Sequence, residues 1–430
     1  MHKSISLSFI KKIVQTPLFK ISSLNSLSVL IRMGFSVITS NMLAVFVGAG
    51  GMAYLGNFRN FMSTLEGVST LAFPSGIVKY VGENEEKEKE VTKIITTVLL
   101  TFLGFSILLG VLIFAFSDYL NAKIFGSDLN LEIIFKVVAI VLPFNVVSVL
   151  YVSIINGLGK YSKLIKATIF SNVLGLLLTV FLIYEYELIG AILSIVFQST
   201  ILFLVSFFYV PKELQIIGRI QFKQYDVSVI KKLLGFSFMI LPSMLLSPYL
   251  TLEIRKFLIE RVGLIDAGFW EAMARVSNLY LIFITTLVSI YFYPELVRAK
   301  NKWETKKVFL RFYQVIIPIF IVSGVVIYVS RFLILKILFT AEFYPVSDLF
   351  IWQLVADFFK ICGMILGFHF LAKKMVVPYI VIEVVGNLFL YFLSIYLIKS
   401  IGIQGVLVAQ AVEQSLYSLF LLYYLRKTIF

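Results

Sequence analysis

Charged side chains occur inside long apolar stretches of this 430-residue chain, where they are most informative about chemistry. Arg32, Arg59 and Arg275 each lie within such a stretch. A charge at the centre of a membrane-crossing helix costs about 2.5–3.5 kcal/mol on insertion scales, so it is kept only where it faces protein or water. The guanidinium fork matches phosphate oxygens. These three arginines therefore predict a site for an anionic, phosphate-bearing ligand.

Other charges in apolar stretches are candidates for the wall of the same cavity. They are Glu66, Lys136, Glu271, Asp357, Lys360 and Glu413. Helical spacing predicts three pairs, and such pairs can equally be structural, with each charge only neutralising the other. The pairs are Arg59–Glu66, Glu271–Arg275 and Asp357–Lys360. Arg32 differs, because its stretch contains no acidic residue to pair with.

The composition indicates an integral membrane protein. The chain is 60% hydrophobic and only 14% charged, with a mean hydropathy of +0.96. Its apolar stretches are about 20 residues long and lack two-residue alternation, which favours helices over a barrel. One cysteine and two histidines cannot supply a thiolate or imidazole cluster, so we expect no metal and no cofactor.

Twelve membrane-crossing helices are predicted from these stretches. They cover about 24–46, 54–80, 94–116, 131–155, 164–184, 188–210, 232–253, 267–294, 308–330, 346–371, 376–398 and 402–425. The outer connecting segments are short, so no extracytoplasmic domain is expected to hold an active site.

The distribution of basic residues predicts the orientation. With the N-terminus inside, 26 lysines and arginines fall in cytoplasmic segments, 7 in outer segments and five inside helices. This bias is a positive-inside signal and predicts that both termini are cytoplasmic. It also explains most of the net charge of +14 as topology and attraction to anionic lipids, so nucleic-acid binding is not expected.

An internal repeat with an offset of 215 residues divides the chain. Val47-Gly48 recurs as Val262-Gly263, and Gly190 recurs as Gly405. The predicted halves are residues 1–215, which include an interfacial N-terminal segment, and 216–430. Six helices in each half give a parallel repeat. The expected fold is therefore an all-α membrane protein, with about 12 transmembrane helices in two parallel six-helix bundles around a central cavity.

Two stretches resemble a known family. They are GMAYLGNFRNFMSTLEGVSTLAFPSGIVKYV, residues 51–81, and FWEAMARVSNLYLIFITTLVSIYFYPEL, residues 269–296. Together with the parallel six-helix repeat, they resemble the Wzx polysaccharide flippases of the multidrug/oligosaccharidyl-lipid/polysaccharide exporter superfamily. The resemblance covers essentially the whole chain.

The resemblance implies a flippase that moves undecaprenyl-diphosphate-linked oligosaccharide (an O-antigen, common-antigen or capsule repeat unit) across the bacterial inner membrane by alternating access. Related lipid II flippases carry functional arginines on helices 1, 2 and 8, which match Arg32, Arg59 and Arg275. Those relatives have fourteen helices, two of which form a lipid groove, whereas twelve are expected here. Expected partners are the lipid-linked glycan, membrane lipids and other polysaccharide-assembly proteins, around a monomer.

Two alternatives remain. The first is a cation-coupled small-molecule or multidrug exporter of the same superfamily, in which Glu66, Glu271 or Glu413 would carry the ion. Multidrug antiporters of the superfamily use an acidic residue on helix 1, whereas this helix has Arg32 and no acid. The second is a membrane enzyme, such as a polysaccharide polymerase, but the short outer segments leave no room for a catalytic loop. We therefore expect no enzymatic activity.

Overall fold

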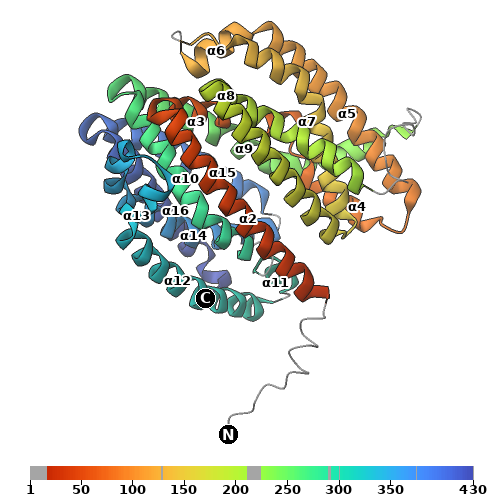
Figure 1. Ribbon diagram of the computed structural model, residues 1–430. Coiled ribbons are helices and arrows are strands. Elements are labelled where there is room, and N and C mark those ends of the chain that lie inside the picture. The colour runs from red at the N-terminus through yellow and green to blue at the C-terminus, as the bar shows by residue number, and fades with distance from the viewer. Residues whose placement is uncertain are drawn as a thin grey trace, which may run out of the picture.

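The computed structural model describes residues 17–126, 129–210, 224–288, 292–299, 301–373 and 375–429 (Figure 1). This part of the chain consists of helices and contains no strand. A chain that crosses a membrane must satisfy every backbone hydrogen bond within itself, and helices do so segment by segment. The helical class expected from the composition is therefore confirmed.

The first group of helices extends from the N-terminus to the linker between the predicted halves. It comprises α2 (Pro17–Phe46), α3 (Gly48–Ser69), α4 (Pro74–Glu83), α5 (Glu88–Ala115), α6 (Ser117–Phe125), α7 (Glu132–Gly157) and α8 (Tyr161–Tyr209). The second group follows the linker. It comprises α9 (Val227–Arg261), α10 (Leu264–Leu287), α11 (Tyr293–Arg298), α12 (Lys302–Val329), α13 (Arg331–Leu338), the 3₁₀ helix η4 (Ala341–Leu349), α14 (Phe350–Ala372), α15 (Val376–Ile401) and α16 (Ile403–Ile429).

Eight helices among the described residues are long and apolar enough to cross a membrane, or up to nine if the bent α9 is one span. α8 holds 49 residues, about 74 Å at 1.5 Å per residue, which exceeds the ~30 Å hydrocarbon layer. It is broken at Glu187, where φ is 47°, and its two arms fold back on each other. α3 and α10 have 22 and 24 residues but carry internal charges. With the arms of α8 counted separately, the described part has twelve helical segments longer than 20 residues.

Two predicted spans differ from the structure. The span expected at 54–80 is broken after Ser69, and Leu71 and Ala72 adopt positive φ values of 51° and 52° before Pro74 begins α4. Proline has no amide hydrogen to donate to the Thr70 carbonyl one turn earlier, so an α-helix cannot continue unbroken across Pro74. Of the span expected at 267–294, residues 267–287 lie in α10 and residues 293–294 in α11, and residues 289–291 lie outside the described part of the chain. The span expected at 232–253 extends to Arg261, because apolar residues continue on one face of α9.

The 215-residue offset recurs in the backbone. The reversal at Glu187 between the arms of α8 corresponds to Gly402 between α15 and α16, where φ is 60°. In both reversals a glycine three residues later packs against the preceding arm, so closely that a Cβ on Gly190 would overlap the Leu182 carbonyl and one on Gly405 would overlap the Leu397 carbonyl. This recurrence supports the repeat inferred from the sequence.

The hydrophobic cores show how the two groups of helices meet. One core is shared, and it joins Met52 and Phe58 of α3 to Trp270 and Met273 of α10. A second core lies within the first group and the start of α9, around Phe102. A third core lies within the second group, around the C-terminal end of α10 and the helices that follow it. The two groups therefore share a core at the ends where α3 and α10 begin, and have separate cores towards the opposite ends. Figure 1 agrees, since α4 and α11 lie well apart.

The N-terminal ends of α3 and α10 are in close contact. Gly268 of α10 lies against the Ala49 carbonyl of α3, and a Cβ at this position would overlap that oxygen. Backbone cannot move aside as a flexible side chain can, so this contact requires glycine.

We expect Gly268→Ala to destabilise the protein by about 1–3 kcal/mol, because overpacking against backbone outweighs the gain in helix propensity. Gly104→Ala in α5 is the matched control, because no atom lies within 4 Å of its added Cβ. The control should stabilise the protein by about 0.4–1 kcal/mol. Thermal unfolding of the purified protein measures both. Equal effects at the two glycines would contradict the contact.

An ion pair fastens the start of α9 to α5. The Lys93 ammonium lies 2.5 Å from the Asp226 carboxylate, and the backbone N–H of Asp226 donates to Thr97 Oγ1 at 3.1 Å. Asp226 also caps α9 by accepting from the backbone N–H of Ser228. The hydrogen bond from Lys93, with those from Ser228, lowers the pKa of Asp226 to about 2. This pair holds the first helix after the linker against the first group of helices.

Asp226 should stabilise the fold in a pH-dependent way. Because its folded-state pKa is below the unfolded value of about 3.9, its contribution is fully present above pH ~4 and is lost as the pH falls through about 2. The difference in melting temperature between the native protein and Asp226→Asn should therefore shrink between about pH 5 and about pH 2. A constant difference across that range would exclude this contribution.

Candidate functional site

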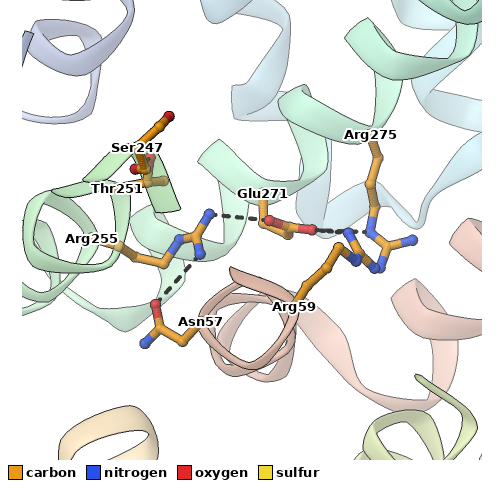
Figure 2. A network of polar contacts seen from close by, with 7 residues as sticks. All are labelled: Asn57, Arg59, Ser247, Thr251, Arg255, Glu271 and Arg275. Atoms are coloured by element: carbon orange, nitrogen blue, oxygen red, sulfur yellow. Dashed lines mark hydrogen bonds and ion pairs between the residues drawn. The ribbon is translucent and has the colours of Figure 1, made fainter. Parts of the chain in front are cut away.

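One carboxylate is surrounded by three guanidinium groups where α3, α9 and α10 meet (Figure 2). Glu271 Oε1 accepts from Arg59 at 2.5 Å, and Glu271 Oε2 accepts from Arg255 at 3.1 Å. Arg275 Nε lies 3.6 Å from Glu271 Oε1. Arg255 also donates to Asn57 Oδ1 at 3.4 Å. These four charged residues form one network, called here the arginine network.

Local sequence explains why the network can assemble. Glu271 and Arg275 are four residues apart and so lie on one face of α10. Arg59 reaches Glu271 from the neighbouring helix α3. Gly56, one turn before Arg59, has no side chain, and a Cβ at Gly56 would overlap both Arg255 and Glu271. The glycine therefore lets α3 approach the two charged side chains.

The network carries an excess of positive charge. The side chains of Arg255, Arg275 and Glu271 are 4%, 8% and 6% exposed, whereas that of Arg59 is 42% exposed. Nε of Arg255 and Nε of Arg275 are buried and have no hydrogen-bond partner. Three cations and one anion leave the group two charges positive. Arg59 is therefore the member of the network that an anionic ligand can contact.

A cavity of about 670 Å³ adjoins the network. Its wall includes Arg59 and Asn60 of α3, and Ser247, Thr251 and Arg255 of α9. Every other residue of the wall belongs to α10, α14, α15 or α16. The cavity is therefore lined mainly by the second group of helices.

A second polar cluster lies on this wall around Asp357 of α14. Asp357 is 1% exposed and accepts hydrogen bonds from Ser277 at 2.6 Å, from Gln353 at 3.1 Å and from the hydroxyl of Tyr280. A buried carboxylate is tolerated when several donors hold it. Asp357 therefore links α14 to α10.

Two more carboxylates line the wall between α15 and α16. Glu383 accepts from the hydroxyl of Tyr417 at 2.9 Å, and Glu413 accepts from Gln414 at 2.7 Å. Gly386 of α15 lets the Glu413 side chain of α16 lie close to the α15 backbone, since a Cβ at Gly386 would lie 3.0 Å from Glu413 Oε1. Lys360 of α14 lies on the same wall. The cavity thus has an arginine end and an acidic end.

The structure brings five of the predicted residues together and leaves others apart. Those on the cavity wall are Arg59, Glu271, Asp357, Lys360 and Glu413. Arg275 lies behind the wall, in the arginine network. Three predicted residues do not line this cavity, namely Arg32, Glu66 and Lys136.

The surroundings of the three outlying residues differ. Arg32 on α2 is half-buried, and its Nε has no hydrogen-bond partner. Glu66 on α3 is exposed. Lys136 pairs with Glu132 one turn earlier on α7 and lies over the ring of Phe114.

Of the three predicted pairs, the structure contains Glu271–Arg275. Arg59 pairs with Glu271 instead of Glu66, because α10 packs against that side of α3. Asp357 is held by neutral donors, and no ion pair with Lys360 occurs among the described residues.

Arg255 is a residue of the site that the sequence analysis missed. It was counted with the outer segments, because the seventh span was expected to end at residue 253. Leu252, Ile254 and Leu258 are buried, so the apolar pattern continues past Arg255. Arg255 itself is 3% exposed and stacks on Trp270, with 4.9 Å between the guanidinium carbon and the ring centroid. Continuation of the apolar residues was the signal that could have identified it.

The described residues form long apolar helices, six of which enclose a polar cavity, and this combination defines a multi-pass helical membrane protein of the transporter type. An inward-facing multidrug resistance MATE family transporter of the MOP superfamily has the same fold, with a TM-score of 0.78 and 12% identity over 92% of this chain and 94% of that one. The lipid II flippase MurJ in an inward closed conformation matches with a TM-score of 0.72 and 17% identity, covering 95% of this chain and 87% of MurJ.

The chain matches the family described as "Polysaccharide biosynthesis protein" over residues 60–348, and it belongs to this family. It is 23% identical over 391 residues to the lipid III flippase of Escherichia coli (strain K12), covering 90% of this chain and 93% of the relative. It is 25% identical over 330 residues to a putative O-antigen transporter of Shigella flexneri, covering 75% of this chain and 74% of the relative. These findings support the resemblance to Wzx-type flippases.

Proposed function

We propose that this protein flips an undecaprenyl-diphosphate-linked oligosaccharide across the bacterial inner membrane by alternating access. The observation that carries the proposal is the arginine network, in which Arg59 is the one arginine with a largely accessible side chain, 42% exposed. A diphosphate offers several oxygens to such a fork. Membership of the polysaccharide biosynthesis family and the similarity to a lipid III flippase agree with this substrate class.

The three arginines of the network have different proposed roles. Arg59 contacts the diphosphate directly, since it lines the cavity and is partly exposed. Arg275 and Arg255 act through Glu271 and through the positive potential that they add at this end of the cavity. Arg32, proposed from the sequence as a third diphosphate contact, lies on α2 outside this cavity, so such a contact belongs to another conformation of the cycle.

The proposed orientation places both termini in the cytoplasm, on the basis of the charge bias of the loops. The N-terminal ends of α3 and α10 are then on the outer side, where the shared core and the contact between Gly268 and Ala49 hold the two groups of helices together. The proposal treats the chain as two six-helix halves, residues 1–215 and 216–430, as inferred from the internal repeat. Rocking of these halves about the shared core would expose the cavity alternately to each side.

A cation-coupled exporter of small molecules is the second candidate. It is favoured by the acidic end of the cavity, with Glu383 and Glu413, and by a fold shared with multidrug transporters. This function predicts resistance to cationic compounds in a sensitive host. The proposed flippase predicts none.

Reconstitution in liposomes tests the proposed function. Purified protein is inserted into vesicles containing a polyprenyl-diphosphate-linked disaccharide, and its passage to the outer leaflet is followed with a membrane-impermeant pyrophosphatase. We expect the protein to make the labelled lipid accessible much faster than protein-free vesicles do. Accessibility at the protein-free rate, together with efflux of a cationic dye, would favour the exporter. Contacts with other assembly proteins and the monomeric state are also part of the proposal.

A further inference from the structure

The cavity has two chemically distinct ends, and only the arginine end has a part in the proposed function. The acidic end contains the carboxylates of Asp357, Glu383 and Glu413 against one cation, Lys360. It lies along α10 from the arginine network, since Ser277, which bonds Asp357, comes six residues after Glu271, or about 9 Å at 1.5 Å per residue. A group attached to the diphosphate can therefore reach this end.

Neutral polar groups complete the wall of the acidic end. Asn278 and Gln410 line the cavity, and their amides make no hydrogen bond within the described part of the chain. Gly367 leaves space in front of the Tyr417 hydroxyl, to which an added Cβ would lie at 3.4 Å. Amides and hydroxyls that face an open cavity are suited to a ligand rich in hydroxyl groups.

Aromatic side chains stand beside these polar groups. Tyr379 and Tyr417 line the cavity from α15 and α16, and Trp270 lines it near the arginine end. Aromatic rings with polar partners provide apolar faces and hydrogen bonds together. A sugar ring has both kinds of surface, because its C–H groups are apolar and its hydroxyls are polar.

The charges of the acidic end set its preference among sugars. Asp357 is already held by three donors, whereas Glu383 and Glu413 face the cavity with one side-chain donor each among the described residues. Carboxylates accept strong hydrogen bonds from an ammonium group and ordinary ones from hydroxyls, and they repel another carboxylate. The acidic end of the cavity is therefore suited to a sugar that offers hydrogen-bond donors.

We propose that the wall formed by α14, α15 and α16 is the glycan subsite of this protein, and that Glu383 and Glu413 select a sugar bearing amino and hydroxyl donors over a sugar bearing a carboxylate. This inference rests on the proposed flippase function. It assigns the diphosphate to the arginine end of the cavity and the glycan to the acidic end.

Three synthetic probes test the subsite. They are polyprenyl-diphosphate-linked disaccharides that share the lipid, the diphosphate and the first sugar. Their second sugar carries either a free amine, an acetylated amine or a carboxylate. Flipping of each in proteoliposomes is expected to be fastest for the amine and slowest for the carboxylate, with about a tenfold difference between the amine and the acetylated probe, as one charged hydrogen bond implies.

Substitutions then separate this inference from the function on which it rests. The double variant Glu383→Gln and Glu413→Gln should bring the three rates to within about threefold of one another. Glu185→Gln, at an exposed carboxylate on α8, is the matched control and should keep the wild-type order. Arg59→Ala should lower all three rates alike.

Equal rates for the three probes with the wild-type protein would overturn the subsite, as would a double variant that keeps the wild-type order. In both results the lipid still moves, so the proposed flippase function survives. If none of the probes moves with the wild-type protein, the flippase function fails and the subsite fails with it.

Discussion

Replacing Arg59 by alanine is expected to slow flipping of the diphosphate-linked lipid by about ten- to a hundredfold, the value of one charge-assisted hydrogen bond of about 1.5–3 kcal/mol. Arg59 is the partly exposed member of the arginine network and lines the cavity. Its loss leaves Glu271 paired with Arg255 and Arg275, so the protein should still fold. Rates in proteoliposomes containing equal amounts of protein measure the effect.

Two further variants sharpen this result. Arg59→Lys keeps the charge but loses the two-pronged geometry, so an intermediate rate is expected. Arg261→Ala removes an exposed arginine at the end of α9, away from the cavity wall, and should leave the rate unchanged. If Arg59→Ala flips lipid at the wild-type rate, the diphosphate does not bind at this guanidinium.

Replacing Glu271 by glutamine is expected to destabilise the protein by about 3–5 kcal/mol, the usual cost when one partner of a buried ion pair is removed. The substitution leaves the buried guanidiniums of Arg255 and Arg275 close together with no anion among the described residues. Since the network joins α3, α9 and α10, the contact between the two groups of helices should weaken first. A fall in the melting temperature of the purified protein measures this.

Glu253→Gln is the matched control for Glu271→Gln. Glu253 lies on α9 near the same end of the molecule and pairs with Lys123 at 3.7 Å, but both side chains are partly exposed, at 25% and 32%. Such a pair contributes about 0–1 kcal/mol. Similar losses for the two variants would mean that Glu271 does not hold the three helices together.

Glu271 and Arg59 have different parts in the arginine network. Glu271 occupies the position of an anion among three guanidiniums, and it keeps Arg255 and Arg275 folded into the protein. Arg59 lies 2.5 Å from Glu271, and a phosphate could bind its guanidinium beside Glu271 or in place of it. Stability therefore depends mainly on the buried members, and binding on the exposed one.

The sequence alone predicted the class of protein, because apolar stretches of about 20 residues are a local property that needs no tertiary contact. It also predicted the 215-residue repeat, which reappears in the reversals at Glu187 and Gly402. Arg59 and Glu271 stood out as charges in apolar surroundings, where the cost of burial makes a charge conspicuous. These conclusions depend on residues close together in the chain.

Tertiary structure decided which charges meet. The partner of Arg59 is Glu271, 212 residues away, because α10 packs against α3 at glycines that admit close approach. Helical periodicity shows which residues share a face of one helix, but it does not show which helix covers that face. For the same reason Arg255 was missed, and Arg32, Glu66 and Lys136 were grouped with residues that line a cavity from which they are absent. The separation of that cavity into an arginine end and an acidic end arises only when α10, α14, α15 and α16 are packed together.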